Sequence, residues 1–209
     1  MASLLPNAGE SGGSRTKIPQ PTNNYKPITE ASAPAPQIYR NVICHCYKSI
    51  MTNVEDFLKS KGIEFILHEH PAVYTCEEAE KYCSDIPGLA CKNLLLKDKK
   101  SGRYFLIILP AEKRADFKKI GETVGDKQVT FASPEALFEK LGLEPGAVSP
   151  FGLLNDKNHE VEIYIDQKVY YAKTVSFHPN RNTASLELSG NMFRKFLQAI
   201  ENRTKVIDL

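Results

Sequence analysis

The sequence predicts an α+β, or mixed α/β, fold for the folded part of the chain. Helical patterns are interspersed irregularly with short strands, and some neighbouring strands are joined by hairpin-like turns, unlike the strict strand–helix repeat of a doubly wound sheet. The chain has 209 residues, of which 42% are hydrophobic, enough to form one well-packed domain. No G-x-G-x-x-G, P-loop, G-x-S-x-G or H-E-x-x-H pattern occurs in the sequence.

Residues 1–45 differ in composition from the rest of the chain. They are rich in Ser, Gly, Pro, Asn and Thr and include the stretch ASAPAPQ at 31–37. Such a segment buries little apolar surface, so we expect a flexible tail whose role the sequence leaves open. Residues 46–209 are expected to form a single domain.

Five helices are expected from apolar periodicity and from capping residues. Near 49–61, Ile50, Val54, Phe57 and Leu58 would share one helical face, and Gly62 is a stop signal. A T-x-x-E capping box at 75–78 predicts a helix that extends to about Tyr82. The remaining helices are expected over 112–120, from the cap Ser133-Pro134 to Gly142, and after the cap Ser189.

Eight strands are expected from short runs of β-branched, aromatic and alternating apolar residues. Lys99 to Gly102 forms a plausible hairpin turn between two of them. The expected strands cover 64–68, 92–98, 103–109, 128–131, 160–165, 174–177, 184–188 and 205–209.

Charge and cysteine content limit the partners and cofactors. The formal charge is +2, from 27 basic and 25 acidic residues, so contact with nucleic acid must depend on a local patch, and no DNA partner is expected. No apolar run approaches the ~20 residues that a membrane span needs, and the start is a poor signal peptide. Five irregularly spaced cysteines indicate a reducing, cytoplasmic compartment. Cys44-His45-Cys46 lacks further ligands at zinc spacing, so neither metal nor cofactor is expected.

Lys92 has an unexpected place in its strand. Alternation puts Lys92, Leu94 and Leu96 on one face, and the opposite face, with Asn93, Leu95 and Lys97, should be the wetter one. A lysine at the mouth of a strand can reach out to water, and this interpretation is favoured when the strand is considered alone. The alternative is a functional lysine on an apolar face.

Two loops carry further chemically capable residues. Glycines near both ends of 146–152 could bring backbone amides close to a ligand, although an ordinary turn explains them as well. The turn 177–183, FHPNRNT, could be local Asx-turn chemistry or a rigidly presented imidazole with amide neighbours.

Four segments occur in an order that resembles one known family: HPAVYTCEEA, CKNLLLKD, PGAVSPFGLLND and FHPNRNTASL. Together they resemble the YbaK-like trans-editing family, which is related to the insertion domain of bacterial prolyl-tRNA synthetase. The resemblance is strongest to the freestanding deacylases that hydrolyse Ala-tRNA(Pro), and it covers about 50–209. It implies a mixed, largely antiparallel sheet flanked by helices, and a mischarged tRNA acceptor end and prolyl-tRNA synthetase as partners.

The resemblance implies a role for each matching residue. Lys92 matches an essential lysine and His178 a histidine that supports substrate placement. Binding of the substrate is implied for Val73, Tyr74, Gly146, Ala147, Val148, Ser149, Pro150, Asp156 and Asn180. Val73 and Tyr74 could equally be core residues. Cys91 stands where many relatives carry Thr or Ser, and compact bacterial relatives lack the long tail.

The expected chemistry is hydrolysis of an activated ester with neither a metal nor a covalent intermediate. Lys92 would act as a cation, because an ordinary lysine is protonated near neutral pH. Backbone amides of 146–149 would hold the aminoacyl group or its oxyanion, and His178 would orient the ribose or the water. A pocket too small for proline would remove alanine selectively.

One basic group is expected to contact the acceptor stem, although charge runs are usually solvated. It comprises Lys97, Lys99, Lys100 and Arg103, with Lys113, Arg114, Lys118 and Lys119 nearby in sequence. Two alternatives stay open: a deacylase for Cys, Ser or Thr, and a non-catalytic module that binds tRNA or a synthetase.

Overall fold

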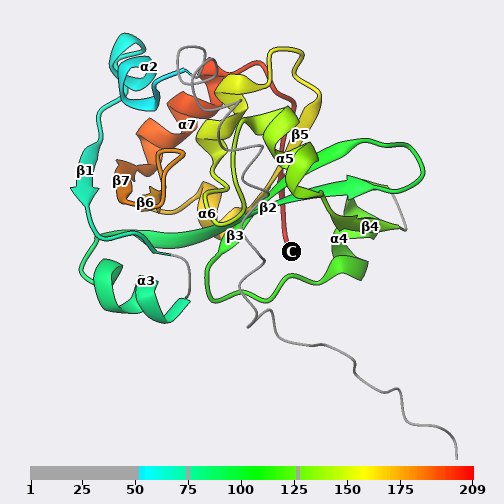
Figure 1. Ribbon diagram of the computed structural model, residues 1–209, viewed down its shortest axis with the longest axis horizontal. Helices are drawn as coiled ribbons and strands as arrows, with labels where there is room; N and C mark the ends of the chain where they lie inside the picture. The colour runs from blue at the N-terminus through cyan, green and yellow to red at the C-terminus, as the bar shows by residue number, and fades with distance from the viewer. Residues whose placement is uncertain (1–51, 74–75, 126–127) are drawn as a thin grey trace, which may run out of the picture. The chain divides into compact units, whose positions relative to one another are not determined.

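The computed structural model describes residues 52–73, 76–125 and 128–209, and within these the chain forms an eight-stranded sheet with helices packed against it (Figure 1). The strand order is β1-β7-β6-β2-β3-β5-β8, with β4 also paired to β2. The strands are β1 (Ile66–Glu69), β2 (Leu89–Asp98), β3 (Tyr104–Pro110), β4 (Val129–Phe131), β5 (Val161–Asp166), β6 (Thr174–Phe177), β7 (Ala184–Ser189) and β8 (Thr204–Ile207).

The sheet is mixed, which confirms the predicted fold class. β1–β7, β2–β3, β2–β4 and β6–β7 pair antiparallel, whereas β2–β6, β3–β5 and β5–β8 pair parallel. All eight expected strands are present, with ends shifted by a few residues.

Capping explains where several helices begin. The Ser133 side chain accepts from the Ala136 N–H, and the helix ends at Gly142, which has φ 67°. Ser189 caps the last helix in the same way. The helices are α2 (Val54–Ser60), α3 (Cys76–Cys83), α4 (Phe117–Val124), α5 (Pro134–Leu141), α6 (Gln167–Tyr170), α7 (Gly190–Ala199) and the 3-10 helix η1 (Pro150–Asn155).

The helices differ from the expected ones in where one begins and in two additional short helices. The helix expected over 112–120 begins only at Phe117, because the Asp116 carboxylate accepts from two backbone N–H groups and caps it there. α6 and η1 were not expected. The expected cap Thr75 and the residues before 52 lie outside the described part of the chain.

β2 changes its strand partner along one edge. Leu89 and Ala90 pair with β6, whereas Leu96 to Asp98 pair with β4. β3 runs along the opposite edge from Cys91 to Lys97. The residues around Lys92 therefore lie where β2 leaves one neighbour and has not yet reached the next.

The two faces of β2 bury different apolar clusters. Leu95 is 4% exposed and belongs to the larger cluster with α2, α7 and η1, whereas Leu96 is fully buried in the smaller cluster under α4. The expectation that the Leu95 face is the wetter one is therefore wrong, because η1 and the loop before it cover that face.

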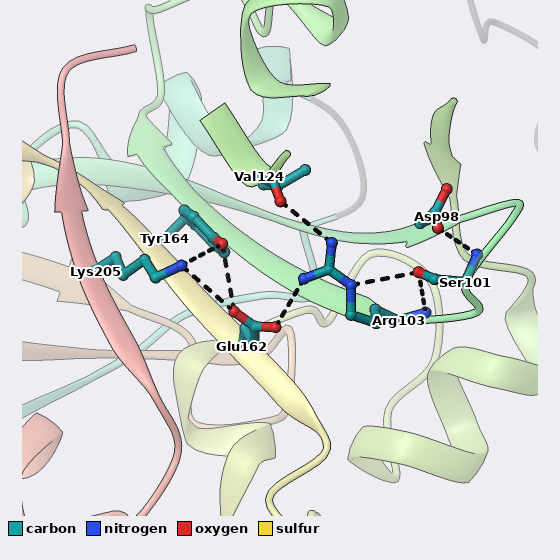
Figure 2. A network of polar contacts seen from close by, with 7 residues as sticks. All are labelled: Asp98, Ser101, Arg103, Val124, Glu162, Tyr164 and Lys205. Carbon is teal, nitrogen blue, oxygen red and sulfur yellow. Dashed lines mark hydrogen bonds and ion pairs between the residues drawn. The ribbon is translucent and has the colours of Figure 1, made fainter. Parts of the chain in front are cut away.

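A polar network fixes the end of α4 to the sheet (Figure 2). The Arg103 guanidinium donates to Glu162 Oε1 at 3.2 Å and to the Val124 carbonyl at 3.3 Å. The second oxygen of Glu162 accepts from the Tyr164 hydroxyl at 3.3 Å, and Lys205 Nζ donates to the same hydroxyl at 3.0 Å. Arg103 thereby joins β3, β5 and α4.

Candidate active site

One half of the sheet presents a polar face opposite the larger core. Phe177 and Leu186 lie opposite each other in β6 and β7 and point into that core. Because strand side chains alternate, the residues between them point the other way. On this polar face lie His68, Ser176, Ser185 and Glu187, and His68 Nε2 is 2.9 Å from Glu187 Oε2.

His178 follows β6 at the edge of this polar face. Its Nδ1 is 2.9 Å from the Ala184 carbonyl oxygen. A carbonyl only accepts, so Nδ1 carries the proton and the neutral ring keeps a lone pair on Nε2. Burial lowers the pKa of His178, the bond to Ala184 opposes this, and the nearby His70 lowers the pKa further. His178 is therefore suited to accept a proton near neutral pH.

His70 and Ser185 support His178 and were missed by the sequence analysis. The rings of His70 and His178 meet edge to face, with centroids 5.8 Å apart. His70 Nδ1 donates to the Pro71 carbonyl at 2.8 Å, which leaves Nε2 to accept from the Ser185 hydroxyl at 3.1 Å. The sequence signal was the alternation in 184–188, which predicts a polar face, whereas His70 was considered only as the first residue of the segment HPAVYTCEEA.

Lys92 lies on the same face as His178. Ala90 is opposite Ser176 in the parallel β2–β6 pair. Lys92 and His178 each lie two residues further along their segments, so alternation puts both side chains on this face. Lys92 Nζ donates to the Ala111 carbonyl at 3.1 Å. The two residues that the sequence predicted as catalytic therefore share one face of the sheet.

Asn93 connects β2 to the glycine-containing loop. Its side chain points away from Lys92 and donates from Nδ2 to the Val148 carbonyl at 3.0 Å. Its Oδ1 is buried and has no hydrogen-bond partner among the described residues. A buried amide oxygen without a donor is costly, so this atom is a candidate acceptor for a ligand or a water.

The loop residues differ in what they offer to a ligand. Gly146 is exposed with φ 90°, while the Ala147 N–H already donates to the Glu144 carbonyl. Ser149 is fully buried, and its hydroxyl accepts from the Phe151 N–H at the start of η1. Pro150 is buried in η1. Ser149 and Pro150 therefore shape the loop, and Gly146 supplies its exposed turn.

Asp156 holds the end of this loop in place. Its side chain is only 5% exposed. Its carboxylate accepts from the Glu160 N–H at 3.1 Å, the Val161 N–H at 2.9 Å and Asn202 Nδ2 at 2.8 Å. The protein itself uses this carboxylate, and the structure does not bring it to Lys92.

The segment near Val73 lies against the loop that carries Asn180. Val73 is 6% exposed, and its N–H donates to the Asn182 carbonyl at 3.0 Å. Asn180 has φ 60°, and both polar atoms of its side chain are buried with no partner among the described residues. This unusual backbone and the unpaired amide are typical of a binding position. Tyr74 lies outside the described residues.

The predicted basic group lies at the other end of β2 from Lys92. Lys97 Nζ sits over the Tyr104 ring, on the face of Asn93. Lys99 and Lys100 are exposed in the following turn, and Arg103 belongs to the network of Figure 2. Lys99, the first residue of the turn, is seven steps along the strand direction from Lys92, or about 23 Å.

The described residues contain no candidate metal site. Within 52–73, 76–125 and 128–209, no group of three His, Cys, Asp or Glu side chains could hold a metal ion.

Burial, reinforced by Glu112, raises the pKa of the Cys91 thiol to about 12. No helix in these ranges has the length and apolar character to cross a bilayer. Cys44, His45 and Cys46 fall outside the described part.

Comparison with known proteins identifies the family. Residues 70–196 match the family model described as aminoacyl-tRNA editing domain. Prolyl-tRNA editing protein ProX of Acetoanaerobium sticklandii is 37% identical over 147 residues, which cover 70% of this chain and 90% of that protein. A prolyl-tRNA synthetase associated domain-containing protein of Mus musculus is 30% identical over 154 residues, which cover 72% and 90% of the two chains.

A solved structure supports the fold. A crystal structure described as a candidate trans-editing enzyme for prolyl tRNA synthetase superposes with a TM-score of 0.60 at 23% identity and covers 75% of this chain and 94% of that chain. The motif resemblance of the sequence is thereby confirmed. The chain belongs to the aminoacyl-tRNA editing domain family, whose members are hydrolases of mischarged aminoacyl-tRNA esters.

Proposed function

We propose that the chain edits mischarged tRNA(Pro) by hydrolysing its aminoacyl ester, with Ala-tRNA(Pro) as the main substrate. The observation that carries the proposal is the pair Lys92 and His178 on one face of the sheet at the break in β2 pairing. The relatives named above as prolyl-tRNA editing or synthetase-associated proteins support the choice of tRNA. Prolyl-tRNA synthetase is the proposed partner and the cytoplasm the proposed compartment.

Lys92 acts as a fixed cation in this proposal. Its ammonium group has three donors, and the Ala111 carbonyl orients one of them. The remaining positive charge attracts the phosphate of the terminal nucleotide or the developing oxyanion. A lysine held at the edge of the polar face supplies this charge without a change of protonation state.

His178 handles the proton. Its Nδ1–H is fixed on Ala184, so the Nε2 lone pair can accept a proton from the attacking water. The water oxygen bonds to the ester carbon, and the oxyanion then collapses as the bond to the ribose oxygen breaks. The ribose oxygen takes up a proton, with help from the imidazolium or the neighbouring ribose hydroxyl. This sequence of steps uses neither a metal nor a covalent intermediate.

Substrate choice rests on the pocket beside Lys92. A synthetase pocket built for proline rejects a smaller apolar amino acid by only about 1–3 kcal/mol, so a second, smaller pocket is needed to remove alanine. We propose that Val73, the 146–150 loop and the unpaired amide of Asn180 contribute to this pocket. Asp156 contributes only by fixing the loop.

The test is release of labelled alanine from Ala-tRNA(Pro) by the purified chain, with Pro-tRNA(Pro), Cys-tRNA(Pro), Ser-tRNA and Thr-tRNA measured in parallel. The proposal expects fast release of alanine and no release of proline. Fast release of only Cys, Ser or Thr would show that the chain is a deacylase but that alanine is not the amino acid it removes. Binding of tRNA without any release would favour the non-catalytic module instead.

A further inference from the structure

An exposed aromatic residue lies on the same face of the sheet as Lys92. Phe131 in β4 is opposite Leu96 in β2, so the two side chains share one face. Lys92 and Leu94 lie on that face as well, because they alternate with Leu96. Phe131 is 53% exposed, and its ring meets Phe117 of α4 with centroids 5.1 Å apart. An apolar ring half exposed to water is available to a further partner.

The segment before α4 adds positive charge to this aromatic pair. A shallow hollow of about 550 Å³ is lined by Arg114, Ala115, Asp116, Phe117 and Lys118. The side chains of Arg114 and Lys118 are exposed. The Asp116 carboxylate is engaged by the N–H groups of Lys118 and Lys119, which offsets its repulsion of an anion. The hollow therefore has two cationic side chains and one aromatic side chain in its lining.

The hollow is connected to the proposed active site. Lys92 Nζ donates to the carbonyl of Ala111, three residues before Arg114. Along β2, Lys92 and Leu96 are separated by about 13 Å. Partly buried Leu94 lies between them, and Ala115 and Phe117 pack on the same cluster. Because Leu96 on this face is fully buried under α4, a strand held at Lys92 would pass over the outside of residues 111–118 to reach Phe131.

We propose that Arg114, Lys118, Phe117 and Phe131 form a docking surface for the single-stranded 3′ end of the tRNA. Single-stranded RNA is bound by cations that contact phosphates and by aromatic rings that stack on unpaired bases. This combination is present here and continues to Lys92. The inference rests on the proposed function, because the strand must reach the ester at Lys92 and His178.

This surface differs from the basic turn at 97–103 that the sequence suggested. Lys97 lies on the opposite face of β2, over Tyr104, and Arg103 is engaged with Glu162. Lys99 and Lys100 are at the far end of β2. The structure therefore favours the 114–118 segment for the nucleotides next to the ester.

The test compares matched variants of the full chain. Phe131→Ala and the double variant Arg114→Ala/Lys118→Ala are compared with Tyr171→Ala, which removes another exposed aromatic side chain (71%), and with Lys59→Ala/Lys173→Ala, which removes two other exposed cations. Phe131→Leu keeps an apolar contact with Phe117 but removes the stacking ring. It replaces Phe131→Ala in the comparison if Phe131→Ala lowers the melting temperature. The measured quantities are kcat and KM for Ala-tRNA(Pro), and Kd for uncharged tRNA(Pro) at several salt concentrations.

We expect KM and Kd to rise about tenfold in Phe131→Ala, the effect of losing one base-stacking contact, with kcat at saturation unchanged. The Arg114→Ala/Lys118→Ala variant should lower the slope of log Kd against log salt by about 1.4. Both control variants should match the wild-type protein. Unchanged KM and Kd in the Phe131 and Arg114/Lys118 variants would overturn the inference while leaving the deacylase intact. A wild-type protein that releases no amino acid, yet loses tRNA binding in these variants, would overturn the proposed function and keep the RNA surface.

Discussion

His178 is fixed by Ala184: its Nδ1 lies 2.9 Å from the Ala184 carbonyl oxygen. This one bond selects the tautomer in which Nε2 is the acceptor, and burial lowers the pKa of the ring so that it stays neutral. His70 lies edge-on to it and adds to the lowering. The pair therefore predicts how the rate depends on pH.

We predict that activity persists below the ordinary histidine pKa and is lost as pH falls through the lowered pKa of His178. In His70→Asn one cause of the lowering is gone, so the acid limb of kcat/KM should move to higher pH. The measurement is a pH–rate profile between about pH 4.5 and 8. His68→Asn is the matched control, since His68 bonds Glu187 on the same face. An acid limb that is identical in all three proteins would show that His178 is not the titrating group.

A second prediction concerns the buried carboxylate of Asp156. Asp156→Ala should lower the free energy of unfolding by about 2–4 kcal/mol, because two backbone N–H groups and Asn202 lose a charged acceptor inside the protein. Denaturant unfolding measures this loss. The control Asp85→Ala removes an exposed carboxylate and should change stability by less than about 0.5 kcal/mol. Equal losses of stability in the two variants would contradict the conclusion that the hydrogen bonds of Asp156 hold the end of the loop in place.

Two glycines should respond differently to alanine. A Cβ on Gly190 would lie 2.0 Å from the Ala172 carbonyl oxygen, so Gly190→Ala should destabilise the fold by at least about 3 kcal/mol. At Gly146 no atom lies within 4 Å of the added Cβ, and only φ +90° opposes it, at a cost of about 1–2 kcal/mol. Thermal unfolding ranks the two variants. Gly146→Ala as the more damaging change would mean that the loop is tightly packed.

Cys91 should be chemically inert although it precedes Lys92. With its thiol pKa raised to about 12, the thiolate is scarce at neutral pH and alkylation should be slow. Peptide-resolved mass spectrometry after iodoacetamide treatment measures the rate, with the same peptide from the urea-unfolded chain as reference. Equal rates in the folded and unfolded chain would show that burial does not protect this thiol.

Local rules were sufficient for several elements of the fold. Ser133 and Ser189 cap helices as their sequence context predicts, and Gly142 ends one of them. α6 was missed because a helix of four residues carries too little periodicity, although Asp166 caps it. Leu95 is covered by residues distant in sequence. The composition of β2 alone therefore could not show which of its two faces is more exposed to water.

The site was partly predictable. Lys92 and His178 follow from motifs that resemble the family, but their position on one face of the sheet depends on the parallel β2–β6 pairing, which no local pattern specifies. The supporting role of His70 also depends on tertiary contact, through Ser185 and His178. The basic residues show the same limit, because the folded chain puts Lys97 and Lys92 on opposite faces of one strand.

The most direct test of the account is the single-turnover rate of Ala-tRNA(Pro) hydrolysis by Lys92→Ala, with Lys173→Ala as a control for an exposed lysine and melting temperatures measured for both. We predict a loss of 10²–10³-fold, on the order expected for removing one electrostatic contact to a developing oxyanion. Lys173→Ala should keep the wild-type rate, and both variants should keep the wild-type melting temperature. A Lys92→Ala protein that folds and turns over at nearly the wild-type rate would contradict the central claim, and Lys92 would then be only a lysine whose ammonium reaches water at the mouth of its strand.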